Sequence, residues 1–450
     1  MNRRNIVVAA GALGVLAFAG WGGAHLVASG HARGLDAPVS REGLALQSRA
    51  LDRSITLFQQ RVGTDPYSST DLGMLSGLFL QRARQTGDYQ DVLRAEEAAR
   101  RSLTLRPEHN LRADATLAAS LLDQHRFREA LASAQALVRE QPGSATFRAM
   151  LGEIQLELGM YDSAAGTFGS LETSRNDLDV APRLARWQEI EGHTAAAREL
   201  LYAARDQALV RHGLLPEQRA WFHLRVGDLE LRNGELDAAE DAFRAGLAIS
   251  PGDYRLQAAM ARLEAARGDW AGATGYGERV LGTVPDPATL ALLSDVSAAA
   301  GDSAQAREYA KAVEVSLMAN PGTFHRADGL FLLDHGLRRA EVLRQAGEDV
   351  KSRKDIYGYD LLAWALHRAG RDAEAAVAMK QALRTGSEDA LLLYHAGMIE
   401  SALGRRDAAR EHLERALEVN PAFSVTQAPL ARAALDSLRG GWFSRLLPHG

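Results

Sequence analysis

A small residue recurs inside amphipathic segments along most of the chain. Successive occurrences are 35, 34, 33, 42, 34, 33, 34, 35 and 34 residues apart, at Ala95, Ala130, Ala164, Ala197, Ala239, Ala273, Ala306, Ala340, Ala375 and Ala409. A constant period of this length is typical of a repeat architecture. The spacing of 42 exceeds one repeat by eight residues, which we place near residues 211–219 as a longer helix, a loop, or a helix followed by a loop.

Other positions follow the same period and predict helical hairpins. An apolar or small residue stands four positions after most of these alanines, on the same helix face. Five positions before most of them stands a glycine, which can end a helix in the left-handed conformation. A proline twelve positions after several of them closes the second helix. Glycines within the predicted first helices, Gly152, Gly227 and Gly397, indicate that two helices approach closely there.

This pattern resembles the tetratricopeptide repeat family. Ala164-x3-Phe168, and Ala239-x3-Phe243 with Pro251, match the family's second helix, whereas the aromatic positions of the first helix are mostly aliphatic or polar here. The resemblance covers about Asp71 to Phe423. It implies an all-α fold, a right-handed superhelical solenoid of about ten tetratricopeptide-like helix-turn-helix repeats with a concave groove lined by the first helices.

The repeats define the expected organisation of the chain. We assign residues 1–33 to a signal peptide or N-terminal membrane anchor and 34–70 to a linker and capping helix. Residues 71–219 and 220–423 form an N-terminal and a C-terminal lobe of repeats, and 424–450 form a capping helix and an apolar tail. The expected registers are 71–110, 111–144, 145–177, 178–219, 220–253, 254–286, 287–320, 321–355, 356–389 and 390–423.

The N-terminus carries a targeting pattern. Arg3 and Arg4 precede an uncharged apolar run from residue 6 to 20, which continues weakly to 28. This arrangement is typical of a secretory signal, although residues 6–28 also approach the length of a membrane span. We favour a cleaved signal and a periplasmic or secreted location. An uncleaved inner-membrane anchor with membrane contact through residues 6–28, or a buried helix of a soluble chain, also fits.

Composition and motifs argue against several functions. The net charge of −5, with both signs interspersed, indicates no nucleic-acid partner. The absence of cysteine excludes disulfides, catalytic thiols and thiolate metal sites. No phosphate loop, zinc-protease motif or nucleophile elbow occurs, and we interpret the glycine-rich segment 272–277 as helix packing. We therefore expect no enzymatic activity, no cofactor and no metal.

The family resemblance implies which residues face the groove. Mapping the groove positions onto this sequence gives Arg186, Glu189, Trp221, Asp228, Arg232, Arg255, Arg262, Asp295, Tyr357, Asp360, Trp364, His367, Arg368 and Tyr394. Aromatic residues and arginine are enriched in binding hot spots. Trp364 and Tyr357 could instead pack within the array, and the charged members could form an ordinary solvated surface.

These observations favour a protein-protein interaction scaffold that binds a peptide or partner protein in its groove. Envelope assembly, secretion or transport would suit the targeting pattern. The alternative is an accessory or regulatory subunit of a separately encoded enzyme or membrane transporter. The C-terminal residues Trp442, Phe443, Leu446 and Leu447 either fold back on the last repeat or contact a partner or membrane.

Overall fold

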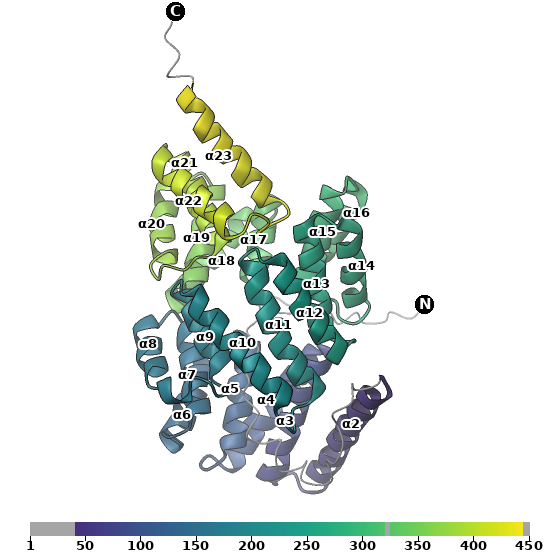
Figure 1. Ribbon diagram of the computed structural model, residues 1–450. Helices are drawn as coiled ribbons and strands as arrows, with labels where there is room; N and C mark the ends of the chain where they lie inside the picture. The colour runs from purple at the N-terminus through teal and green to yellow at the C-terminus, as the bar shows by residue number, and fades with distance from the viewer. Residues whose placement is uncertain (1–40, 320–324, 444–450) are drawn as a thin grey trace, which may run out of the picture.

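Ten helical hairpins follow one another in the structure, a computed structural model that describes residues 41–319 and 325–443 (Figure 1). All regular elements in these ranges are helices. The first five hairpins are α3 (Ser69–Thr86) and α4 (Tyr89–Leu105), α5 (Leu111–Asp123) and α6 (Phe127–Glu140), α7 (Ala145–Glu157) and α8 (Tyr161–Gly169), α9 (Ala181–Ile190) and α10 (Thr194–Val210), and α11 (Pro216–Arg232) and α12 (Leu236–Ile249). The second five are α13 (Tyr254–Arg267) and α14 (Trp270–Leu281), α15 (Pro287–Ala299) and α16 (Ser303–Ala319), α17 (Arg326–Asp334) and α18 (Arg339–Ser352), α19 (Ile356–Arg368) and α20 (Asp372–Ala382), and α21 (Ala390–Ala402) and α22 (Arg406–Val419). The predicted all-α solenoid of ten repeats is confirmed.

Single helices flank the stack. The N-terminal helix α2 (Arg41–Thr64) packs against α3, and its Leu51, Ile55 and Val62 are buried. At the other end α23 (Gln427–Phe443) packs against α21 and α22. A short 3-10 helix, η1 (Glu172–Ser174), follows α8. No helix in the described ranges is both long and apolar enough to cross a membrane.

Several sequence predictions concern residues that the structure does not describe. The signal or anchor in residues 1–33 lies outside the described ranges, as do Leu446 and Leu447. The side chains of Trp442 and Phe443 are likewise not described. The roles assigned to these residues stay predictions.

The eight additional residues lengthen two helices and their connection. α10 runs to Val210 and α11 begins at Pro216, four residues before the expected register. Proline suits the first position of a helix, because the first turn needs no hydrogen bond from its backbone nitrogen. One hydrophobic cluster includes residues on both sides of this junction, from Ala149 to Ala242. The proposed division into lobes at this junction stays a prediction.

The periodic alanines form the centre of each hairpin. Eight of the ten have no exposed surface and Ala306 is 9% exposed. Ala340 is the exception: it lies on the surface of α18, where Val342 takes the buried position. The prediction for Ala340 was wrong because α18 begins three residues after Gly336, whereas α16 begins two residues after Gly301. The longer turn moves the buried face along the helix.

Glycine in the first helix lets the two helices of a hairpin touch. A Cβ atom added to Gly152 would lie 2.8 Å from the Phe168 ring, and one added to Gly397 would lie 2.6 Å from Leu413. A Cβ at Gly227 would lie closer still to the ring of Phe243. The predicted close approach at these three glycines is confirmed.

The first helices form the inner layer of the stack. α11, α13, α15, α17, α19 and α21 each pack against a neighbouring first helix, and no comparable packing joins successive second helices in the described ranges. The first helices are therefore nearer to one another, and the stack curves with them on its concave side.

The curvature brings distant hairpins into contact. The backbone nitrogen of Lys354 donates to the carbonyl oxygen of Leu158 at 3.1 Å, and that of Ile356 donates to the hydroxyl of Tyr161 at 2.8 Å. These residues belong to the third hairpin and to the segment that joins the eighth hairpin to the ninth. We call this set of bonds the inter-turn contact, because it joins successive turns of the superhelix.

Candidate partner-binding site

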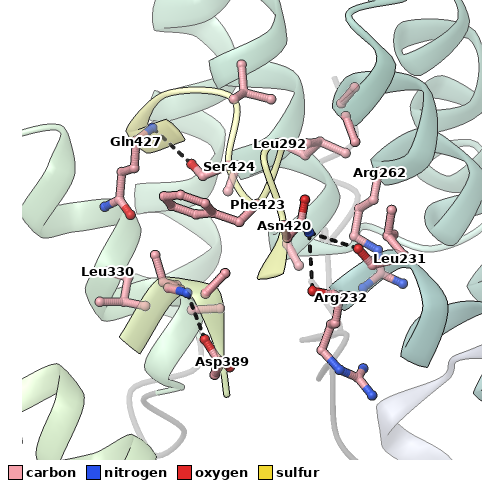
Figure 2. Close-up of a pocket in the computed structure, with 18 of the residues that line it drawn as sticks. Leu231, Arg232, Arg262, Leu292, Leu330, Asp389, Asn420, Phe423, Ser424 and Gln427 are labelled. Carbon is pink, nitrogen blue, oxygen red and sulfur yellow. Dashed lines mark hydrogen bonds between the residues drawn. The ribbon is translucent and has the colours of Figure 1, made fainter. Parts of the chain in front are cut away.

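A cavity of about 460 Å³ lies on the concave side of the C-terminal half (Figure 2). Its walls come from α11, α13, α15 and α17, from the N-terminal ends of α19 and α21, and from the loop before α23. We call it the axial cavity. Inner helices from consecutive hairpins meet there, so its shape depends on the curvature of the whole stack.

The loop of residues 420–427 crosses the concave side and closes one face of the axial cavity. Asn420 Nδ2 donates to the carbonyl oxygen of Leu231 at 2.9 Å and to that of Arg232 at 3.3 Å. The Phe423 ring lies 5.5 Å from that of Tyr394. We call this segment the crossing loop, since it links the tenth hairpin to the fifth, as Figure 2 shows at Asn420.

One wall of the axial cavity is acidic. Asp295 lies on α15, Asp328 and Asp334 lie on α17, and Asp286 and Asp389 precede α15 and α21. Burial raises the pKa of Asp328 to about 6, and it also raises the pKa values of Asp286 and Asp334. Ionisation of these carboxyl groups is therefore disfavoured while no cation is close.

Hydrogen bonds fix several of these carboxylates. Asp334 accepts from Trp364 Nε1 at 2.8 Å and from Gln427 Nε2 at 2.5 Å. Asp295 lies 2.8 Å from His335 Nε2, at the C-terminal end of α17. The acidic wall is consequently held in place by neighbouring helices and by the crossing loop.

The opposite wall carries both signs of charge. Arg262 donates to Asp228 at 2.8 Å, and Arg232 donates to Glu189 at 2.5 Å. Glu189 also lies 3.8 Å from Arg186 and 3.9 Å from Arg225. Burial opposes ionisation of Glu189, but the three arginines overcome this effect and lower its pKa.

The predicted groove residues divide into three groups. Arg232, Arg262, Asp295 and Tyr357 line the axial cavity, as does Glu189. Arg186, Asp228, Arg255 and Asp360 form ion pairs within the chain. Trp221, Trp364 and Tyr394 are buried, and His367 contacts Trp364. Their part in partner binding stays a prediction, and the cavity-lining group is the best placed for it.

Two of the paired residues show how completely the inner wall is used. Asp360 is fully buried and accepts from Arg326 at 2.5 Å, while His395 Nδ1 lies 2.7 Å from its other oxygen. The Tyr357 ring lies between two guanidinium groups, 5.0 Å from Arg186 and 4.9 Å from Arg326. Tyr357 thus both lines the axial cavity and packs within the array.

The aromatic residues of the ninth and tenth hairpins form a stack. Trp364 is 2% exposed, and its ring lies 4.2 Å from His395, 4.9 Å from His367 and 5.7 Å from Tyr394. Tyr394 is 1% exposed. Trp364 reaches the axial cavity only indirectly, through its hydrogen bond to Asp334. The remaining predicted aromatic residue, Trp221, packs edge-on against Phe222, with ring centroids 5.1 Å apart.

Sequence reasoning missed the crossing loop and Asp334. Residues 424–450 were assigned to a cap, and the hairpin pattern contains no signal that places Phe423 and Gln427 beside α17. Asp334 was noted only as the neighbour of His335, at a helix end. Contacts that depend on curvature are not encoded in a local period.

The described residues offer no arrangement for metal or nucleotide chemistry. They contain no group of three side chains that could hold a metal ion. The glycine-rich segment 272–277 lies within α14, where a Cβ added to Gly277 would lie 2.8 Å from Leu293. This close contact supports the packing interpretation.

Comparison with known proteins identifies the repeats. Tetratricopeptide repeat models match residues 115–176, 191–254 and 390–423. The last range coincides with the tenth predicted register, and the second spans the longer repeat. The chain is a tetratricopeptide repeat protein. Arrays of tetratricopeptide repeats mediate protein-protein interactions, so the chain is an interaction scaffold in this general sense.

No functionally curated protein matches the sequence. Two of the solved structures that it resembles are tetratricopeptide assemblies of other kinds. A tetratricopeptide repeat protein from Parabacteroides merdae is 18% identical, covers 57% of this chain and 97% of its own, and has a TM-score of 0.39. The APC/C hetero-tetramer Cut9-Hcn1 is 12% identical, covers 89% of this chain and 96% of its own, and has a TM-score of 0.33.

Proposed function

We propose that this tetratricopeptide protein is a non-catalytic scaffold that holds a segment of a partner protein in the axial cavity. The observation that carries the proposal is the cavity itself, whose walls are the inner helices of consecutive hairpins. Concave sites with an apolar lining and a few placed polar groups are the usual locations of bound ligands. Here the lining combines Leu292, Leu330 and Phe423 with charged side chains.

We also propose that the scaffold works on the outer side of the cytoplasmic membrane, in assembly, secretion or transport at the cell envelope. The basic and apolar pattern of residues 1–28 supports this location. The partner would then be a protein of the same compartment.

Site-specific photo-crosslinking in cells tests both statements. A crosslinking amino acid at Ala291, which lines the axial cavity, should give a discrete adduct with one partner. The same amino acid at Val377, which is 70% exposed on α20, is the matched control and should give none. The protein and its adduct should appear in the membrane or extracytoplasmic fraction.

Two results would contradict the proposal. Equal adducts at Ala291 and Val377, or none at Ala291, would exclude the axial cavity as the binding site. Recovery of the adduct in the cytosol with residues 1–33 still attached would exclude the proposed location.

A further inference from the structure

We propose that the axial cavity takes an extended peptide through a lysine or arginine side chain, whose charge lies between the carboxylates of α15 and α17. This inference rests on the proposed function and names the chemistry of the partner segment. It draws on charge, on unpaired polar atoms and on the apolar lining.

The balance of charge around the cavity favours a cation. Seven carboxylate side chains line it, against two guanidinium groups. Asp286, Asp328 and Asp334 form no ion pair with lysine or arginine in the described ranges, and Asp295 has only His335. A pocket lined by one sign of charge attracts ligands of the opposite sign. A bound cation would also make it easier for these buried carboxyl groups to ionise.

A buried acceptor points to a hydrogen-bond donor on the ligand. Gln427 is 4% exposed and lines the cavity, yet its Oε1 has no hydrogen-bond partner within the described residues. Its Nε2 donates to Asp334, and a carboxylate accepts only from that end of the amide, so the oxygen must face the other way. Figure 2 shows this oxygen on the side of Phe423. An unpaired buried acceptor is costly, and a ligand N–H group would satisfy it.

An unpaired donor on the opposite wall favours a peptide over a free amine. Arg262 binds Asp228 through Nη2, while its Nε is buried without a partner in the described residues. Gln427 and Arg262 lie on opposite sides of the cavity in Figure 2. A peptide backbone supplies both an N–H donor and a carbonyl acceptor, whereas a polyamine supplies donors only.

The apolar lining suits the stem of a long cationic side chain. Leu292, Leu330 and Phe423 lie among the lining residues. Lysine and arginine bury their methylene groups against apolar surface while the charged end stays in a polar environment. The lining therefore accommodates the stem, and the acidic wall accommodates the charge.

Fluorescence anisotropy with the full chain tests the inference. The probes are blocked peptides of sequence Gly-Ala-Leu-X-Leu-Ala-Gly, where X is lysine, arginine, citrulline or glutamate. We expect the lysine and arginine peptides to bind about tenfold more tightly than the citrulline and glutamate peptides, with a preference that declines at high salt. Asp295→Asn should reduce this preference severalfold. Asp407→Asn removes the same charge from a side chain that is 95% exposed on α22, and it should leave the preference unchanged.

A second variant separates the unpaired acceptor from the charge. Gln427→Met should weaken all four peptides while keeping the preference for lysine and arginine. Equal binding of the citrulline and lysine peptides, abolished by Ala291→Trp, would overturn the inference and leave the scaffold function intact. Absence of binding by every peptide would also overturn the inference. The scaffold function would fall only if Ala291 also formed no crosslink.

Discussion

Glu189 illustrates how the fold occupies positions that would otherwise face a partner. Arg186 and Arg232 are predicted groove residues, and both pair with Glu189 inside the stack. Removing one partner of a buried ion pair leaves an uncompensated charge, so these side chains are bound to one another before any ligand arrives. The free space is left in the C-terminal half, at the axial cavity.

A pair of histidines lies between successive turns of the superhelix. His125, in the turn between α5 and α6, and His325, just before α17, have ring centroids 4.3 Å apart. Burial lowers the pKa of His325 to about 4, with a smaller contribution from Arg353. Burial, His325 and Arg353 together lower the pKa of His125 well below its usual value. Both rings are therefore neutral at pH 7.

We predict that this pair makes folding sensitive to acid. Between pH 6.5 and 4 the unfolded chain binds more protons at His325 than the folded chain, so the free energy of unfolding should fall as pH falls. At pH 5 the loss from His325 should be about 2 kcal/mol. Urea unfolding at pH 7 and pH 5 should show a smaller loss for His325→Gln than for the original chain.

The comparison needs a control because other groups titrate in this range. The pKa of Asp328 is raised to about 6, so Asp328 contributes stability below about pH 4 that is lost as pH rises to 6, the opposite sign to His325. The exposed His212 provides the matched variant, His212→Gln, which should keep the full acid response. Identical responses from all three proteins would exclude a role for the histidine pair.

At the scale of single elements, the hairpin depends on a glycine facing a large residue. Gly227 on α11 lies against Phe243 on α12, and Phe243 has no exposed surface. The ring cannot move away without disturbing the core, so the helix spacing is set by the missing Cβ atom. The same arrangement occurs at Gly152 with Phe168.

We predict opposite effects of alanine at two helical glycines. Gly227→Ala should lower the free energy of unfolding by about 1–3 kcal/mol, because the added methyl overpacks a closed interface. Gly77→Ala, on α3, meets no atom within 4 Å and should raise it by about 0.5–1 kcal/mol through helix propensity. Chemical denaturation of both variants is the measurement. A Gly227→Ala protein as stable as Gly77→Ala would refute the packing account.

Most of the fold could be predicted because each hairpin repeats the same local chemistry. The alanines, turn glycines and closing prolines fixed the register of ten repeats, and only Ala340 was misplaced, by a longer turn at Gly336. The site could be predicted only in part. Arg232 and Tyr357 were found at groove positions, but Gln427 lies in a loop whose position depends on the summed curvature of many hairpins.

The molecule as a whole is closed by contacts that are remote in sequence. Arg128 Nε donates to the carbonyl oxygen of Ser352 at 3.2 Å, and Asn420 binds the end of α11. A Cβ atom added to the turn glycine Gly192 would collide with the backbone of Gly386. An open superhelix would lack these bonds, and the axial cavity would lose its crossing loop. Closure of the stack is therefore the condition on which the binding proposal depends.

A distance between spin labels at residues 128 and 352 tests this closure most directly. The chain has no native cysteine, so cysteines at these two exposed positions would take the labels alone. Closure predicts one narrow distance at the short limit of double electron-electron resonance. Six hairpins stacked without closing, at about 8–10 Å per helix layer, would instead place the labels roughly 50 Å or more apart. A broad distribution at such long distances would contradict the account.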